Sequence, residues 1–281
     1  MDDTTETPLD TPSPPVENRS PAPPPFEYSG PGRRRMRLMR NEQWLIYCLP
    51  FILFMLVGVF EPHGPTKGVF AEEGYITYNL YPFVYTLKII LTSLAIVWVW
   101  PGYRQFPWKV NRLGVVVGIV GAVLWISINK GQQFISADLL KDWGLGSLTK
   151  LGARSGFNPL HELRDNPGWA WQFLAIRFFG LVIIVPIIEE FFLRGFLMRY
   201  FIEYDWWKVP FATMTPLAIL VGIGVPMLMH PQELIAAFVW FSMVTWLMFH
   251  TRNIWDCVVA HGVTNLLMGL WVVYSGDWWL M

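Results

Sequence analysis

Long apolar runs separated by short polar segments dominate this chain. Runs of roughly 18 or more apolar residues are long enough to cross a bilayer as helices. The predicted spans cover residues 43–60, 82–100, 113–129, 169–202, 209–229, 233–249 and 254–273. A break within the long fourth segment would raise the number of spans from seven to eight. We therefore expect an all-α fold, a polytopic transmembrane helical bundle of seven to eight spans.

The composition agrees with this class. Of the 281 residues, 53% are hydrophobic and 15% are charged, and the mean hydropathy is +0.36. Soluble domains carry roughly 25% charged residues, so the charged fraction is low. Cys48 and Cys257 both fall within predicted spans, and we expect no disulfide framework from them.

The region before the first span has a different composition. Residues 1–32 are rich in Pro, Thr, Ser and acidic residues, which predicts a disordered tail. Five arginines follow directly, Arg33, Arg34, Arg35, Arg37 and Arg40. The positive-inside rule then predicts a cytoplasmic N-terminus, and binding of anionic lipids is the alternative role of this cluster. Because the only basic cluster flanks a span, we expect the lipid bilayer as a partner and no nucleic acid.

The fourth segment carries charges in the middle of its apolar run, IVPIIEEFFLRGFLMR (residues 184–199). Such charges usually face a partner or a watery cavity. Glu190 and Arg194 are four residues apart, so they are expected to pair on one helix face. Glu189 has no basic residue at that spacing, which leaves its carboxylate available for chemistry. In the alternative interpretation, these charges reach the headgroups and do no chemistry.

Three other polar residues are candidates for a site. His261 and Asn265 are four apart and share one face of the last predicted helix, where their N–H groups suit a developing oxyanion. Alternatively, both merely hydrogen-bond to neighbouring helices. His230 ends one apolar run and His250 ends the next, and spacing does not distinguish between them. Lys88 lies within a span with no residue spaced to pair with it.

Together these residues resemble the motifs of the CPBP family, the CAAX-protease and bacteriocin-processing membrane proteins that include type II CAAX prenyl endopeptidases. VPIIEEFFLRGFLMR is similar to the family's first motif and HTRNIWDCVVAHGVTNLL to its last. The FNPL stretch (Phe157–Leu160) and the dipeptide His230-Pro231 resemble the exosortase-associated CAAX-protease-like subgroup. The second motif, Phe-x-x-x-His, departs from the family's pattern because Pro226 occupies the Phe position, while His230 is retained.

The resemblance implies an intramembrane endopeptidase. Glu189 and His230 would activate a water, His261 and Asn265 would stabilise the oxyanion, and Glu190 and Arg194 would support the site or bind substrate. No cofactor is expected, although Glu189, His230 and His261 could ligate zinc. The resemblance divides the chain into a Pro-rich tail with an Arg-rich end (1–40), accessory transmembrane helices (41–168) and a catalytic core (169–281).

The implied substrate is a membrane-associated or exported protein, with an exosortase-type sorting system as partner and a bacterial cytoplasmic membrane as location. Two alternatives belong to other classes: a catalytically silent immunity or scaffold protein, and a transporter. A transporter commonly has internal repeats, and this chain has no convincing one. The hydropathy pattern also places Glu189 towards the cytoplasmic half and His230 at an outer helix end. The two can meet only if helices are tilted, broken or re-entrant, with Pro186, Pro216 and Pro226 as candidate breaks.

Overall fold

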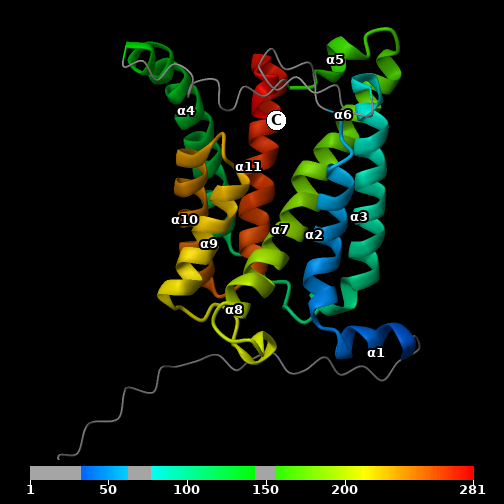
Figure 1. Cartoon of the computed structure of the whole chain (residues 1–281), viewed down its shortest axis with the longest axis vertical. Coiled ribbons are helices and arrows are strands. Elements are labelled where there is room, and N and C mark those ends of the chain that lie inside the picture. The colour runs from blue at the N-terminus through cyan, green and yellow to red at the C-terminus, as the bar shows by residue number, and fades with distance from the viewer. Residues whose placement is uncertain (1–32, 63–76, 143–155) are drawn as a thin grey trace, which may run out of the picture.

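A computed structural model describes residues 33–62, 77–142 and 156–281 (Figure 1). The predicted disordered tail, residues 1–32, lies outside this described part. The described residues form helices without strands, which confirms the all-α class. The helices are α1 (Arg33–Asn41), α2 (Trp44–Gly58), α3 (Tyr81–Tyr103), α4 (Arg112–Asp142), α5 (Pro159–Glu162), α6 (Pro167–Phe179), α7 (Val185–Glu190), α8 (Met198–Tyr200), α9 (Pro216–Met229), α10 (Leu234–Thr251) and α11 (Ile254–Ser275).

Five helices among the described residues are long and apolar enough to cross a membrane, which makes this an integral membrane protein. They are Tyr78–Tyr103, Arg112–Gln132, Pro167–Tyr200, Leu234–Thr251 and Ile254–Ser275. A sixth span results if α1 and α2, which meet at 93°, are counted together. The number is below the predicted seven to eight because two predicted spans are short helices. α2 has 15 residues and α9 has 14, or about 21–23 Å of helix each, against a bilayer core of roughly 30 Å.

The long fourth element runs unbroken from Pro167 to Tyr200, so the alternative of a split segment, with Pro186 as a candidate break, is not found. Two π-helical stretches, Gly180–Ile184 and Phe191–Leu197, join α6, α7 and α8 into one helix. In the first stretch, the Val185 N–H bonds to the Gly180 carbonyl, five residues earlier. This wider register admits Pro186, which has no N–H to donate, without ending the helix.

The long helix and α11 lie between two groups of helices (Figure 1). α2 and α3 pack against each other on one side, and α4, α9 and α10 form the other side. α4 approaches α11 closely because it presents glycines to it. A Cβ on Gly118 would lie 2.6 Å from the Ala260 carbonyl oxygen. This close packing holds the polar face of α11 at a fixed distance from α4 and α10.

The α9–α10 hairpin ends below the upper ends of α4 and α11 (Figure 1). The turn is short: the Glu233 N–H donates to the His230 carbonyl at 3.1 Å. α9 begins at Pro216, and Thr215 caps it by accepting from the Ala218 N–H. Because α9 is only 14 residues long, its end at His230 lies inside the bundle. The hydropathy-based placement of His230 at the outer end of a span is therefore wrong.

The FNPL stretch has structural contacts at the opposite end of the long helix from α8. Phe157 is buried among aromatic rings, including those of Tyr81 and Phe173. Its carbonyl accepts a hydrogen bond from Arg177 at 2.7 Å. The Asn158 side chain caps α5 by accepting from two backbone N–H groups. This stretch therefore anchors the segment before α6 to the bundle.

Candidate active site

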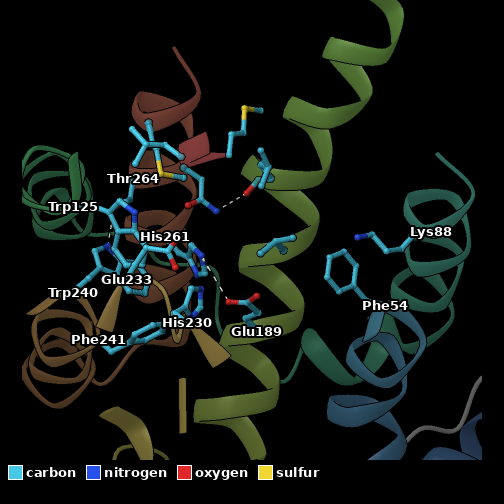
Figure 2. A pocket seen from close by; sticks show the side chains of 16 residues that line it. Phe54, Lys88, Trp125, Glu189, His230, Glu233, Trp240, Phe241, His261 and Thr264 are labelled. Atoms are coloured by element: carbon cyan, nitrogen blue, oxygen red, sulfur yellow. Dashed lines mark hydrogen bonds and ion pairs between the residues drawn. The ribbon is translucent and has the colours of Figure 1, made fainter. Parts of the chain in front are cut away.

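Four of the predicted site residues line one cavity of about 370 Å³ (Figure 2). Glu189 comes from α7, His230 from the end of α9, and His261 and Asn265 from α11. The wall also contains Phe54, Lys88, Trp125, Leu181, Val185, Glu233, Trp240, Phe241, Thr264, Met268, Leu280 and Met281. The tertiary fold thus brings together residues that are up to 76 positions apart in the sequence. The wall is mainly apolar with a few polar groups, as in typical ligand sites.

Behind this wall lies a buried ion pair between Glu190 and Arg194. Both side chains are completely buried, and Arg194 Nη1 donates to Glu190 Oε2, as the four-residue spacing predicts. Two further Arg194 nitrogens, Nε and Nη2, have no hydrogen-bond partner among the described residues. A buried pair with unmet donors is not a strong source of stability, because desolvation offsets much of the attraction. Glu190 has a second contact, to His261 of α11.

His261 connects the two adjacent carboxylates. Its Nδ1 lies 3.0 Å from Glu190 Oε1 and its Nε2 lies 3.9 Å from Glu189 Oε2. A carboxylate accepts hydrogen bonds, so Nδ1 carries a hydrogen and donates it to Glu190. Figure 2 shows the ring between Trp240 and Glu189, and the Trp240 ring packs against it at 4.6 Å. The prediction that Glu190 is paired is confirmed, and Glu189, expected to lack a cation, has an imidazole nearby.

His230 faces the same cavity from the end of α9. Its Nδ1 donates to the Pro226 carbonyl at 2.8 Å, so the lone pair belongs to Nε2. The rings of Trp125 and Phe241 pack on it at 5.8 and 5.5 Å. Aromatic packing around His230 thus comes from α4 and α10, although the motif position holds Pro226. The cavity wall includes His230, whereas His250 ends α10 and stacks on Trp246.

Asn265 takes part in a contact that the π-helical stretch creates. In the i→i−5 register, Pro186 would pair with the Leu181 carbonyl, but proline has no N–H. Asn265 Nδ2 donates to that carbonyl at 2.8 Å instead. One amide hydrogen is therefore used for structure, and the second remains for a group in the cavity. Both readings of Asn265, as a bond between helices and as a possible oxyanion donor, are compatible with this geometry.

Sequence reasoning missed two cavity residues, Glu233 and Trp240, and the partner of a third, Lys88. Glu233 precedes the first residue of α10 and lines the cavity three residues after His230, and the only signal was an acidic residue at the start of an apolar run. Trp240 donates through Nε1 to Thr264 at 3.0 Å, which fixes the indole against His261. Lys88, thought to have no partner, forms an ion pair with Glu61 at 2.6 Å from beyond the end of α2. These contacts join different segments, so the spacing of residues within one helix does not predict them.

The zinc alternative needs three ligands close together. Within the described residues, no group of three His, Cys, Asp or Glu side chains is arranged to hold a metal ion. Glu189, His230 and His261 share the cavity without forming such a cluster in this geometry.

The site is thus a carboxylate and two imidazoles on a cavity wall inside a helical membrane bundle. Residues 170–267 match a family described as Rce1-like, the type II CAAX prenyl endopeptidase Rce1-like proteins. All six predicted site residues lie in this segment, which is about a third of the chain. Comparison with curated proteins and with solved structures found no match in either set. The match is to a protease family and therefore supports a hydrolase.

Proposed function

We propose that the protein is an intramembrane endopeptidase that hydrolyses peptide bonds of membrane-associated or exported proteins. The observation that carries the proposal is the position of His261. It is held by Glu190 on one side and approaches Glu189 on the other, on the cavity that His230 also lines. The match of this segment to a protease family supports the reaction type.

In the proposed reaction, Glu189 and His230 Nε2 hold a water in the cavity, and Glu189 accepts one of its protons. The resulting hydroxide forms a bond to the scissile carbonyl carbon, whose oxygen takes up the negative charge. Glu189 then returns the proton to the leaving amine nitrogen as the carbon–nitrogen bond breaks. This general acid–base sequence uses one carboxylate for both proton transfers.

The oxyanion would be stabilised by donors from α11. Asn265 has one amide hydrogen left after its bond to Leu181, and His261 Nε2 is the second candidate donor in its imidazolium form. Glu190 and Arg194 then act as positioning residues, because the bond to Nδ1 fixes the orientation of the His261 ring. These roles follow the family resemblance and agree with the contacts of each side chain.

The apolar residues around the cavity support a substrate that reaches the site from within the bilayer. A second, smaller cavity joins Glu189 and His230 to apolar residues of α2 and α9, such as Phe51 and Met229. We propose an exported or membrane-anchored protein as substrate and an exosortase-type sorting system as partner, on the subgroup resemblance.

We also propose a bacterial cytoplasmic membrane with a cytoplasmic N-terminus, since α1 and exposed Arg104, Lys109 and Arg112 contribute cations at the same end.

Sequencing of new protein termini in membrane fractions tests this proposal. Cells producing the wild type, Glu189→Gln or Glu203→Gln at matched levels are compared. Glu203 is exposed and lies outside the cavity, so it is a control for loss of an acid. We expect new termini of membrane or exported proteins with the wild type and with Glu203→Gln, and their loss with Glu189→Gln. Identical termini in all three strains would contradict the proposal and favour a non-catalytic protein.

A further inference from the structure

A third cavity, of about 580 Å³, lies at the α1 end of the molecule, away from the candidate active site. It is formed where α1 meets α2 and where the chain leaves α8, two regions that lie at the same end of the bundle (Figure 1). Its wall includes Arg40, Trp44, Tyr200, Tyr204, Trp206 and Trp207. One cation among several aromatic rings is an arrangement suited to an anionic group attached to an apolar body.

The helix α1 lies across the end of the bundle, at 93° to α2. One face is fixed to the protein: Met39 is completely buried, and Arg35 donates to the Val97 carbonyl at 3.0 Å. The opposite side exposes Arg34, Arg37 and Arg40, which recur every three residues. For these three side chains, the described structure records no ion pair or hydrogen bond. The helix therefore holds three cations on one side in a fixed arrangement.

The aromatic residues place this cavity at a membrane interface. Trp44, Tyr204 and Trp207 are exposed, although rings of this size are normally buried in a soluble protein. Trp and Tyr concentrate at the headgroup level, where the ring contacts acyl chains and its polar atom remains in water. Trp44 is the first residue of the apolar helix α2, so the cavity lies where the chain enters the bilayer.

We propose that this cavity and the exposed arginines of α1 bind the headgroup of an anionic phospholipid of the bilayer. The lipid phosphate would contact Arg40 at the cavity, and Arg34 and Arg37 would add attraction along α1. The glycerol and upper acyl chains would contact Trp44, Tyr204 and Trp207. A basic helix next to a span is attracted to an anionic leaflet by each arginine it presents.

Acidic groups nearby set the selectivity of this site. Glu42 also lines the cavity, and its Oε2 accepts a hydrogen bond from Trp44 Nε1 at 2.9 Å. Asp205 is paired with Lys208. Within the wall, Glu42 offsets the charge of Arg40. Arg34 and Arg37 add two exposed cations on the same side of α1, so the net field along the helix favours an anionic ligand. The site contains none of the candidate catalytic residues, so its existence does not depend on the proposed protease function.

Native mass spectrometry of the purified full chain in detergent tests the proposal. The probes are phosphatidylglycerol and phosphatidylcholine with identical acyl chains. We expect phosphatidylglycerol to be retained at least several-fold more tightly. The variant Arg34→Gln/Arg37→Gln/Arg40→Gln should weaken its binding about tenfold or more, since each arginine near a charged leaflet contributes to attraction. Tyr204→Ala should weaken binding of phosphatidylglycerol with all charges intact.

The control variant is Arg104→Gln/Lys109→Gln/Arg112→Gln, which removes three exposed cations between the end of α3 and the first residue of α4, at the same end of the bundle. We expect it to bind phosphatidylglycerol like the wild type. Equal weakening by both triple variants, or equal retention of the two lipids, would overturn the proposal. Displacement of the lipid by inorganic phosphate at the same concentration would also overturn it, because the site would then bind a soluble anion.

Discussion

The side-chain amide of Asn265 donates to the main-chain carbonyl of Leu181 at 2.8 Å, across the contact between α11 and the long helix. The carbonyl is left without a helical partner because Pro186, five residues later, has no N–H. Asn265, from the last predicted motif, thus supplies the hydrogen bond that Pro186, from the first motif, cannot donate. The π-helical stretch and the motif on α11 are therefore one structural unit.

The change Asn265→Ala removes this donor and leaves the Leu181 carbonyl unsatisfied. We expect a loss of about 1–3 kcal/mol in stability, together with reduced activity. Ser93→Ala is the matched control: Ser93 donates to the Ile89 carbonyl at 2.6 Å, which also has its normal partner in α3. Thermal unfolding in detergent measures both. Equal shifts in Tm would contradict the role assigned to Asn265.

Removing one partner of the buried ion pair should reduce the stability of the fold more than replacing both partners by uncharged residues. Arg194→Met leaves the Glu190 carboxylate buried with His261 as its remaining partner, and we expect a loss of about 3–5 kcal/mol. In Glu190→Gln/Arg194→Met no charge is left unpaired, so the double variant should unfold at a higher temperature than Arg194→Met. A double variant that is less stable than the single one would refute this account.

The contact between α11 and the π-helical stretch has no room for a methyl group. A Cβ on Gly262 would lie 2.7 Å from the Val182 carbonyl oxygen, so Gly262→Ala must displace one helix. We expect at least a tenfold loss of activity, because His261 and Asn265 move with α11. Gly224→Ala is the control, since its nearest neighbour lies 4.0 Å away. Retained activity in Gly262→Ala would show that the site tolerates this shift.

A pH effect is expected outside the spans, at Asp277. Lys130 donates to its carboxylate at 2.8 Å, and this hydrogen bond lowers the pKa of Asp277. Because the folded pKa is lower than the unfolded value of roughly 3.9, the stabilisation is present above that pH and is lost as the pH falls through the folded pKa. Asp277→Asn should therefore flatten the decrease of Tm below about pH 4. Parallel curves for both proteins would exclude this contribution, which is small because Lys130 is partly exposed.

The local part of this structure could be predicted from the sequence. The apolar runs indicated the helices, and the spacing of four predicted the pairing of Glu190 with Arg194, which is confirmed. A period of 3.6 residues fixes which side chains share a face, so such predictions depend on one helix only. The N-terminal arginines were expected at a juxtamembrane position, and their helical form at 93° to α2 was not predicted.

Contacts between helices could not be predicted in this way. His261 and Glu190 are 71 residues apart, and their contact depends on how closely α11 approaches α7. The depth of His230 depends on where α9 begins and ends, and hydropathy cannot distinguish a short helix from a full span. Glu233 and Trp240 enter the site through the same short hairpin. These features depend on how the helices pack against each other, and the residue pattern of a single apolar run does not determine that packing.

The measurement that tests the central claim most directly is the hydrolysis rate of the purified protein in proteoliposomes, using a substrate identified by its new terminus. Wild type, Glu189→Gln and the exposed control Glu203→Gln are compared at equal amounts of folded protein. If Glu189 is the base that activates water, Glu189→Gln should lower kcat by about 10²-fold or more while Glu203→Gln retains it. A Glu189→Gln protein that cleaves the substrate at the wild-type rate would contradict the account.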